Sequence, residues 1–261
     1  MFYDLNIPYP GDTGKQAEYI TMAQLLGYKG IAFNTIINLS KYTKLEKEPS
    51  FPKPPELHQV PKFKVWNRCT LNITNFNQLR CLKSISGWDL VAVTTNSEDL
   101  INKLCQNFYT HFDIISLELT RKLPFLIKHK MITAPISQGI LLEVSYVSAI
   151  KDSASCRNIV SNTINLAWAS RNRGILLTSN AERPLFLRGP YDVFNLAGLF
   201  NIPFKSAKIG MSRSCEEVVN RGQTRDRTYA GLISSDKLSD VESWRRPEVL
   251  ELEESGKRRC V

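Results

Sequence analysis

Short apolar runs rich in β-branched residues alternate along the chain with longer segments of helical spacing. The runs predict strands at Phe2–Ile7, Gly30–Ile36, Lys64–Ile73, Asp89–Thr94, Phe112–Leu117, Gly139–Ser145 and Gly174–Ser179. The spacing between them predicts helices at residues 14–27, 75–86, 97–109, 153–172 and 190–220. Because strand and helix alternate, we expect right-handed crossovers that join parallel strands.

The predicted strands are apolar on both faces, as in GILLEV and GILLTS, which is typical of a sheet buried beneath helices. Seven such units in about 220 residues fit a TIM-type α/β barrel of seven or eight strands better than an open doubly wound sheet. Residues 46–62 carry five prolines, so we expect a long surface loop within the barrel there.

The end of the chain has a different pattern. Residues 228–261 hold six basic and seven acidic residues, with little apolar periodicity beyond Trp244. We therefore expect a barrel domain at residues 1–227, followed by a flexible charged tail at 228–261.

The composition narrows the class of protein. Of 261 residues, 43% are apolar and 23% are charged, which is ordinary for a folded globular chain. No apolar run is long enough for a membrane span, and the first residues do not resemble an export signal. Six cysteines without a CxxC pair favour reduced thiols, and hence a cytosolic or nuclear protein.

The charge distribution points to a polyanionic partner. The chain holds 34 Lys and Arg against 25 Asp and Glu, a net charge of +9. Residues 151–227 contain twelve basic and six acidic side chains, and nine of the twelve are arginine. Because the guanidinium fork matches phosphate oxygens, this segment favours phosphate contact, as in nucleic-acid binding.

Signals for independent catalysis are weak. The three histidines, His58, His111 and His129, form no metal-binding pair, and the motifs GxSxG, GxxxxGK[ST] and GxGxxG are absent. An alternative hypothesis is a metal-dependent phosphoesterase that uses the oxygen ligands Asp4, Glu143 and Asp152. The competing interpretation is that these acids cap helices and pair with arginines.

Two motifs supply the candidate RNA-binding residues. AIKDS at 149–153 opens the long helix, where Lys151 and Arg157 add charge to the free N–H groups of the helix start. NAERPLFLRGPYDV at 180–193 places Arg183 and Arg188 on a loop stiffened by prolines. Arg171 and Arg173 are secondary candidates. Solvated basic residues, or a network that links the loop arginines to Glu182 and Asp192, remain alternatives.

These motifs, in this order, resemble the thirty-kilodalton barrel subunit family of ribonuclease P and ribonuclease MRP from archaea and eukaryotes. The resemblance covers about residues 1–222. The matching strings are DLN at 4–6, LGYKGIAFN at 26–34, KLPFLIKHK at 122–130, GILLEVSY at 139–146, AIKDS at 149–153 and NAERPLFLRGPYDVFNLAGLF at 180–200.

The resemblance implies a phosphoesterase-type TIM-like barrel that serves a catalytic RNA as a non-catalytic protein subunit. Its particles remove 5′ leaders from precursor tRNA and process ribosomal RNA. The implied partners are ribonuclease P RNA, ribonuclease MRP RNA, a small RRM-like subunit, other particle subunits and a second copy of the chain. No intrinsic cofactor is implied, magnesium is expected for the RNA catalyst, and the implied location is the nucleus, in the nucleolus.

One departure from the barrel phosphoesterases bears on activity. Those relatives usually carry metal-binding histidines on the first strand, where this chain has Asp4 and Asn6. The leading hypothesis is therefore an RNA-binding subunit. Its rivals are the phosphoesterase and a protein-interaction scaffold with solvated basic residues.

Overall fold

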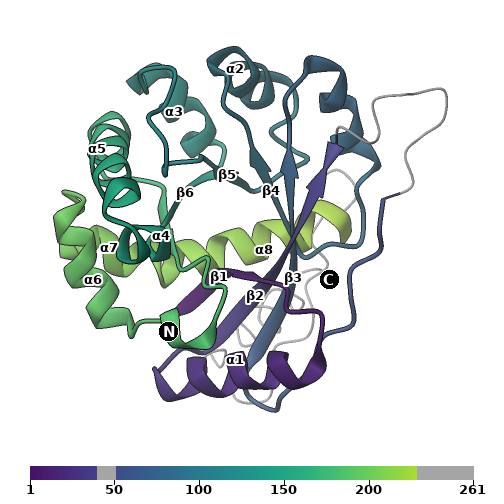
Figure 1. Cartoon of the computed structure of the whole chain (residues 1–261). Coiled ribbons are helices and arrows are strands. Elements are labelled where there is room, and N and C mark those ends of the chain that lie inside the picture. Colours follow the sequence, from purple (N-terminus) through teal and green to yellow (C-terminus); the bar gives the residue numbers. More distant parts are fainter. Residues whose placement is uncertain (40–50, 228–261) are drawn as a thin grey trace, which may run out of the picture. The chain divides into compact units, whose positions relative to one another are not determined.

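The computed structural model describes residues 1–39 and 51–227, and residues 1–227 form one compact unit. The chain alternates strands and helices around a barrel (Figure 1). The strands are β1 (Tyr3–Pro8), β2 (Gly30–Asn38), β3 (Lys64–Asn72), β4 (Leu90–Thr94), β5 (Ile114–Ser116), β6 (Leu141–Ser145) and β7 (Ile175–Thr178). The ends of each strand fall within two residues of the prediction.

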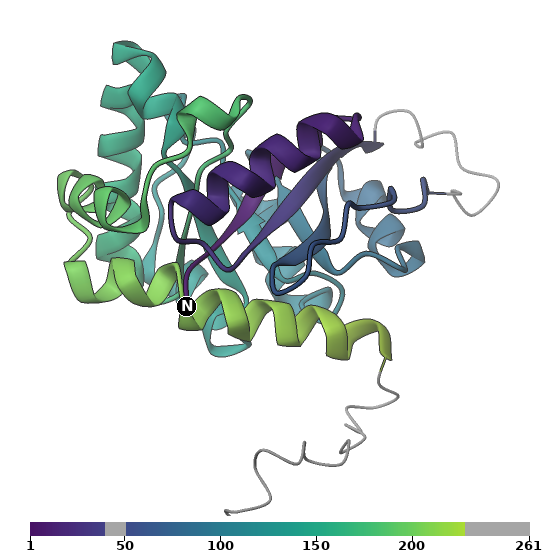
Figure 2. The same ribbon diagram turned by 90° about the horizontal axis from the view of Figure 1, so that it is seen from below.

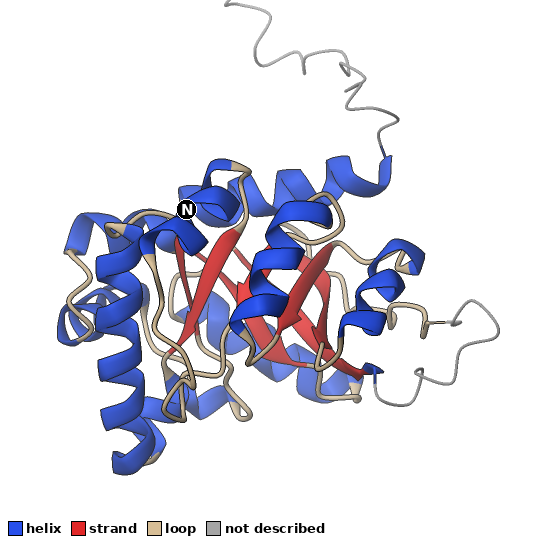
Figure 3. Ribbon diagram, turned by 90° about the horizontal axis from the view of Figure 1, so that it is seen from above, coloured by secondary structure: helices blue, strands red, loops and turns tan. Residues whose placement is uncertain are grey.

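All neighbouring strands are parallel, in the order β1-β2-β3-β4-β5-β6-β7. The two ends of this sheet approach each other, and the backbone N–H of Asn180 donates to the carbonyl of Asn6 at 2.8 Å. Helices surround the strands in Figure 1, and Figure 3 shows helices on either side of the strands in a view turned by 90°. The prediction of a TIM-like α/β barrel, here with seven strands that nearly close, is confirmed.

The crossovers carry helices and short 3-10 segments. They are α1 (Thr13–Leu25), η2 (Phe76–Ser84), α2 (Glu98–Asn107), α3 (His129–Ser137), α4 (Val147–Lys151), α5 (Ser153–Ser170), η3 (Pro184–Phe186), α6 (Pro190–Leu199), α7 (Phe204–Gly210) and α8 (Arg213–Arg227). Asp152 caps α5 by accepting from the backbone N–H groups of Ala154 and Ser155, as the AIKDS motif predicts.

Several predicted elements differ from the structure. The single helix expected at 190–220 is three helices. The break between α6 and α7 falls where Asn201 has a φ of 59° and Pro203 restricts the residue before it. Residues 76–84 form 3-10 turns instead of an α-helix. Helix α3 was not predicted, since Pro135 lies inside it. The expected loop at 46–62 has no helix or strand from residue 51, and its first part lies outside the described residues, as does the expected tail.

The core has two parts, separated by the barrel wall. Inside the barrel lies a cluster that includes Tyr3, Leu5, Trp66 and Cys215, whereas the larger cluster packs the outer face of the strands beneath the helices. No described helix is long and apolar enough to cross a membrane.

Helix α8 crosses the amino-terminal end of the barrel (Figures 1 and 2). It packs very closely, since a Cβ at Gly222 would stand only 2.0 Å from the carbonyl oxygen of Asp89, just before β4. Farther along the helix, Arg225 pairs with Asp113 just before β5 and donates to the carbonyl of Trp88 at 2.8 Å. The helix therefore covers the amino-terminal end of the barrel. The carboxyl end is not covered by this helix and is accessible to a ligand.

Candidate nucleic-acid interface

The carboxyl end of the barrel holds a cavity of about 310 Å³, which we call the mouth cavity. This is where active sites lie in TIM barrels. Each strand, or the loop directly after it, contributes at least one small neutral polar side chain to its lining, and the loop after β5 adds Glu118, whose partly exposed carboxylate accepts from the Thr120 hydroxyl at 3.2 Å. One neutral polar residue can be named for each strand. These residues are Asn6, Asn34, Thr70, Thr94, Ser116, Ser145 and Asn180.

The polar groups of the mouth cavity are connected by hydrogen bonds. The amide of Asn34 donates to the Asn6 side-chain oxygen at 2.8 Å, and the Thr70 hydroxyl donates to the Asn34 oxygen at 2.7 Å. Amides and hydroxyls that bond one another in this way are poor ligands for a hydrolytic metal ion, which prefers imidazole and carboxylate.

A buried ion pair lies on the strands that line this cavity. Arg68 on β3 donates to both carboxylate oxygens of Glu143 on β6, each at 2.6 Å, and also to the carbonyl of Leu5 at 2.9 Å. The Thr178 hydroxyl adds a bond to Glu143 at 2.8 Å. Burial by itself raises the pKa of Glu143, but the charge and hydrogen bonds of Arg68 outweigh it and lower the pKa.

The proposed phosphoesterase ligands do not form a metal site. Glu143 forms an ion pair with Arg68, and the Asp152 side chain caps the N-terminus of α5. Asp4 accepts from the backbone N–H groups of Asn6 and Ser179, each at 3.2 Å. Across residues 1–39 and 51–227, no cluster of three His, Cys, Asp or Glu side chains is arranged to hold a metal ion. The three-carboxylate hypothesis is therefore not favoured, because Glu143 and Asp152 have structural partners and the three acids do not converge on one site.

Sequence reasoning missed Arg68. Its signal was present, since a charged residue within the apolar strand VWNRCTL needs a buried partner of opposite charge. Glu143 in GILLEV is the same signal on another strand.

Lys151 joins the two predicted motifs at the carboxyl end of the barrel. Its ammonium lies 2.5 Å from the Glu182 carboxylate and 4.6 Å from the centre of the Phe186 ring. The AIKDS segment thus contacts the loop after β7. The order of the two motifs in the sequence does not predict this contact.

The loop arginines do not form the expected network with the acidic residues of the loop. Arg188 donates from Nη1 to the carbonyls of Leu185 and Leu187, at 3.0 and 3.3 Å. Its backbone is anchored by the hydroxyls of Tyr28 and Tyr146. Among the described residues, neither loop arginine makes an ion pair with Glu182 or Asp192. Arg183 and Arg157 are exposed.

Arg171 and Arg173 lie at the other end of the barrel, in the turn that precedes β7. They line a cleft of about 1000 Å³ beside α7 and α8. The six candidate residues therefore divide between the two ends of the barrel, with Lys151, Arg157, Arg183 and Arg188 near the carboxyl end.

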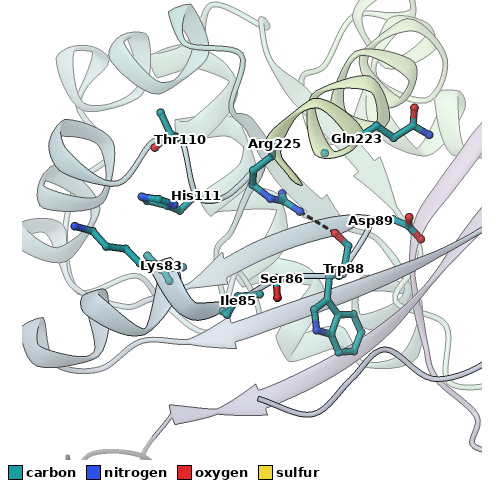
Figure 4. A pocket seen from close by; sticks show the side chains of 12 residues that line it. Lys83, Ile85, Ser86, Trp88, Asp89, Thr110, His111, Gln223 and Arg225 are labelled. Atoms are coloured by element: carbon teal, nitrogen blue, oxygen red, sulfur yellow. Dashed lines mark hydrogen bonds between the residues drawn. The ribbon is translucent and has the colours of Figure 1, made fainter. Parts of the chain in front are cut away.

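A third hollow, of about 600 Å³, lies beside the C-terminal half of α8 (Figure 4). Lys83 and His111 line one part of it, and Arg225 points toward the Trp88 carbonyl. Burial, and then the nearby charges of Lys83 and Arg225, lower the pKa of His111. His111 therefore adds no positive charge to this hollow at neutral pH.

Similar proteins match almost the whole chain. The model of the family "RNase P subunit p30" matches residues 1–227. The probable ribonuclease P protein subunit 3 of Schizosaccharomyces pombe is 31% identical over 90% of this chain and 99% of its own length. The mouse ribonuclease P protein subunit p30 is 31% identical over 90% of this chain and 91% of its own length. The ribonuclease P/MRP protein subunit RPP1 of Saccharomyces cerevisiae is 27% identical over 89% of this chain and 84% of its own.

Solved structures agree on the fold. A chain of the cryo-EM structure of archaeal ribonuclease P with mature tRNA has a TM-score of 0.64 at 14% identity and covers 91% of this chain and 100% of that one. The Aspergillus niger ochratoxinase structure has a TM-score of 0.53 at 8% identity, over 83% of this chain and 71% of that one. With a family match that spans the barrel and relatives that share nearly its full length, the chain belongs to the RNase P subunit p30 family.

Proposed function

We propose that this chain is a non-catalytic protein subunit of ribonuclease P and of ribonuclease MRP, and that it supports the removal of 5′ leaders from precursor tRNA and the processing of ribosomal RNA. The observation that carries the proposal is the family match over residues 1–227. Relatives named as ribonuclease P subunits, one of them shared with the MRP particle, support it.

The chemistry of the barrel favours support over catalysis. In the mouth cavity, amides and hydroxyls occupy most positions at which a barrel hydrolase needs ionisable ligands, and the single carboxylate among the described lining residues is that of Glu118. The buried carboxylate of Glu143 is paired with Arg68 and is therefore not available as a metal ligand. In this proposal the RNA carries the reaction with magnesium, and the protein holds the RNA in shape.

The RNA contacts proposed at the carboxyl end are Lys151, Arg157, Arg183 and Arg188. Arg171 and Arg173, at the amino end, are further proposed contacts. Arg183 and Arg157 present exposed guanidinium groups, whereas the Lys151 charge is shared with Glu182. The protein partners in this proposal are a small RRM-like subunit, other particle subunits and a second copy of the chain. The proposed location is the nucleolus, within the nucleus.

Affinity purification of the tagged chain from its own cells tests the proposal. We expect one dominant structured RNA to copurify, together with cleavage of precursor tRNA at the 5′ end. Treatment of the same preparation with nuclease should remove both the RNA and the activity. A preparation that lacks a dominant RNA, or one whose cleavage activity survives nuclease treatment, would overturn the proposal.

A further inference from the structure

A basic cleft lies at the amino end of the barrel, opposite the mouth cavity. Its walls are the turn before β7, the start of β6 and parts of α7 and α8, and its volume is about 1000 Å³. Its five basic lining residues are Arg171, Arg173, Lys205, Arg213 and Arg221, and Glu217 is its one acidic lining residue. We call it the lower groove.

Much of the positive charge in the lower groove is not neutralised. Arg213 pairs with Glu217 at 2.8 Å, and Arg221 faces Asp113 at 3.6 Å. Arg171, Arg173 and Lys205 are exposed and form no ion pair with any residue in the described ranges. Three cations in one cleft repel one another, so the groove favours an anionic ligand.

The turn that carries two of these cations is fixed by its backbone. Arg171 and Asn172 both have positive φ, 53° and 57°, and the Asn172 N–H donates to the carbonyl of Ala167 at 2.9 Å. Gly174 follows with a φ of 65°, where an added Cβ would stand 2.8 Å from Ile136. The turn therefore fixes the backbone from which the Arg171 and Arg173 side chains extend before a ligand arrives, which lowers the entropy cost of binding.

The volume and the lining residues of the lower groove indicate the class of its ligand. The cleft is far larger than one phosphate group, and its cations come from separate elements, namely the turn before β7, α7 and α8. No aromatic side chain belongs to its lining, so it offers no surface on which a base would stack. Guanidinium groups match successive phosphates.

We infer that the lower groove binds the sugar-phosphate backbone of RNA without reading its bases, as a second RNA contact on the face of the barrel away from Arg183 and Arg188. This inference rests on the proposed function and deepens it. It adds Lys205, Arg213 and Arg221 to the residues that the sequence singled out. Because the two contacts lie at opposite ends of the barrel, substitutions separate them.

The test compares two triple variants of the full chain that lose the same charge. One is Arg171→Gln, Arg173→Gln and Lys205→Gln. The matched control is Lys53→Gln, Lys62→Gln and Arg80→Gln, three exposed cations from the segment between β2 and β4, which contributes to neither contact. Binding of a fluorescein-labelled RNA hairpin is followed by anisotropy between about 50 and 200 mM salt. A melting curve for each variant checks the fold.

The wild-type chain should bind the hairpin, and the groove variant should lower the slope of log affinity against log salt by about two to three, because about 0.7 to 0.9 counterions are released per phosphate contact. The control should keep the wild-type slope, and a change of hairpin sequence should have no effect. A groove variant that behaves like the control would overturn the groove assignment alone. A wild-type chain that does not bind RNA would overturn the proposed function as well.

The same variants distinguish RNA from an acidic protein segment. Labelled polyglutamate of equal charge should bind more weakly than the hairpin and should lose little affinity in the groove variant. If polyglutamate binds as tightly as the hairpin through the same three residues, the groove serves an acidic protein and the inference is wrong.

Discussion

Arg68 and Glu143 face each other across the barrel interior, joined by two hydrogen bonds of 2.6 Å, and both side chains are fully buried. They lie on β3 and β6, and 75 residues separate them in the chain. In a hydrolase of this architecture a buried carboxylate near the strand ends is available for a metal or a proton. Here both oxygens of the carboxylate are paired with the Arg68 guanidinium, so the pair has a structural role and the carboxylate is not available to bind a metal or transfer a proton.

Removal of one partner of this pair should be much worse than removal of both. Arg68→Met or Glu143→Leu alone leaves a buried charge without its partner and should lower the free energy of unfolding by about 3–5 kcal/mol. The double variant should recover at least about 2 kcal/mol of the summed loss. Urea unfolding of the four proteins gives this coupling energy. Strictly additive losses would contradict an obligatory pair.

Asp4 should make the stability depend on pH. Burial raises the pKa of Asp4 to about 6, against the hydrogen bonds from Ser179 and Asn6 that lower it. The folded state therefore favours the protonated acid. Its stabilising contribution is complete below about pH 4 and is lost as the pH rises through 6.

A comparison of the wild type with the Asp4→Asn variant isolates the contribution of Asp4 to the pH dependence of stability. The free energy of unfolding of the wild type, minus that of the variant, should increase by about 2 kcal/mol as the pH falls from about 8 to about 4. Denaturant unfolding at several pH values measures it, and the contributions of other groups cancel in the difference. A difference that does not change with pH would show that Asp4 titrates normally in the folded protein.

The strands were predictable because burial on both faces leaves a signature in the sequence itself. GILLEV and GILLTS hold their apolar runs regardless of which helices cover them. The helices after residue 190 were less predictable, since Asn201 adopts a left-handed conformation that its local sequence does not demand. The contact between Lys151 and Glu182 could not be predicted from the sequence either, because it depends on how β6 and β7 pair.

The division of the candidate arginines was hidden for the same reason. Arg171 and Arg183 are only twelve positions apart, yet β7 runs between them through the barrel wall. A charge count along the chain places them in one basic segment. The barrel places them at opposite ends.

The purified chain should have no nuclease activity of its own. Around the mouth cavity, neutral amides and hydroxyls prevail, and Glu118 alone among the described lining residues is a carboxylate, which is too few for the convergent ligand set that metal-assisted hydrolysis needs. Single-turnover assays of RNA-free protein with precursor tRNA and magnesium, manganese or zinc should give no cleavage above the protein-free rate. Cleavage that Asp4→Ala abolishes would contradict this prediction and restore a carboxylate mechanism.

Replacement of both loop arginines should weaken RNA binding and spare the fold. In Arg183→Ala with Arg188→Ala, the protein loses the Arg188 bonds to the Leu185 and Leu187 carbonyls, which lie within a surface loop. Such bonds contribute about 1 kcal/mol at most, so the melting temperature should fall by only a few degrees. No buried acid is stranded, because the carboxylate of Glu182 is exposed and paired with Lys151.

If both side chains contact phosphates, the same double variant should reduce the salt slope of RNA binding by about one to two. Lys53→Ala with Arg80→Ala is the matched control, since both side chains are exposed and belong to the segment between β2 and β4, whereas the loop follows β7. It should keep the wild-type slope, which separates a local contact from a general loss of charge. A double loop variant that melts far below the wild type, yet keeps its salt slope, would make Arg183 and Arg188 structural residues, because only a phosphate contact links a side chain to counterion release.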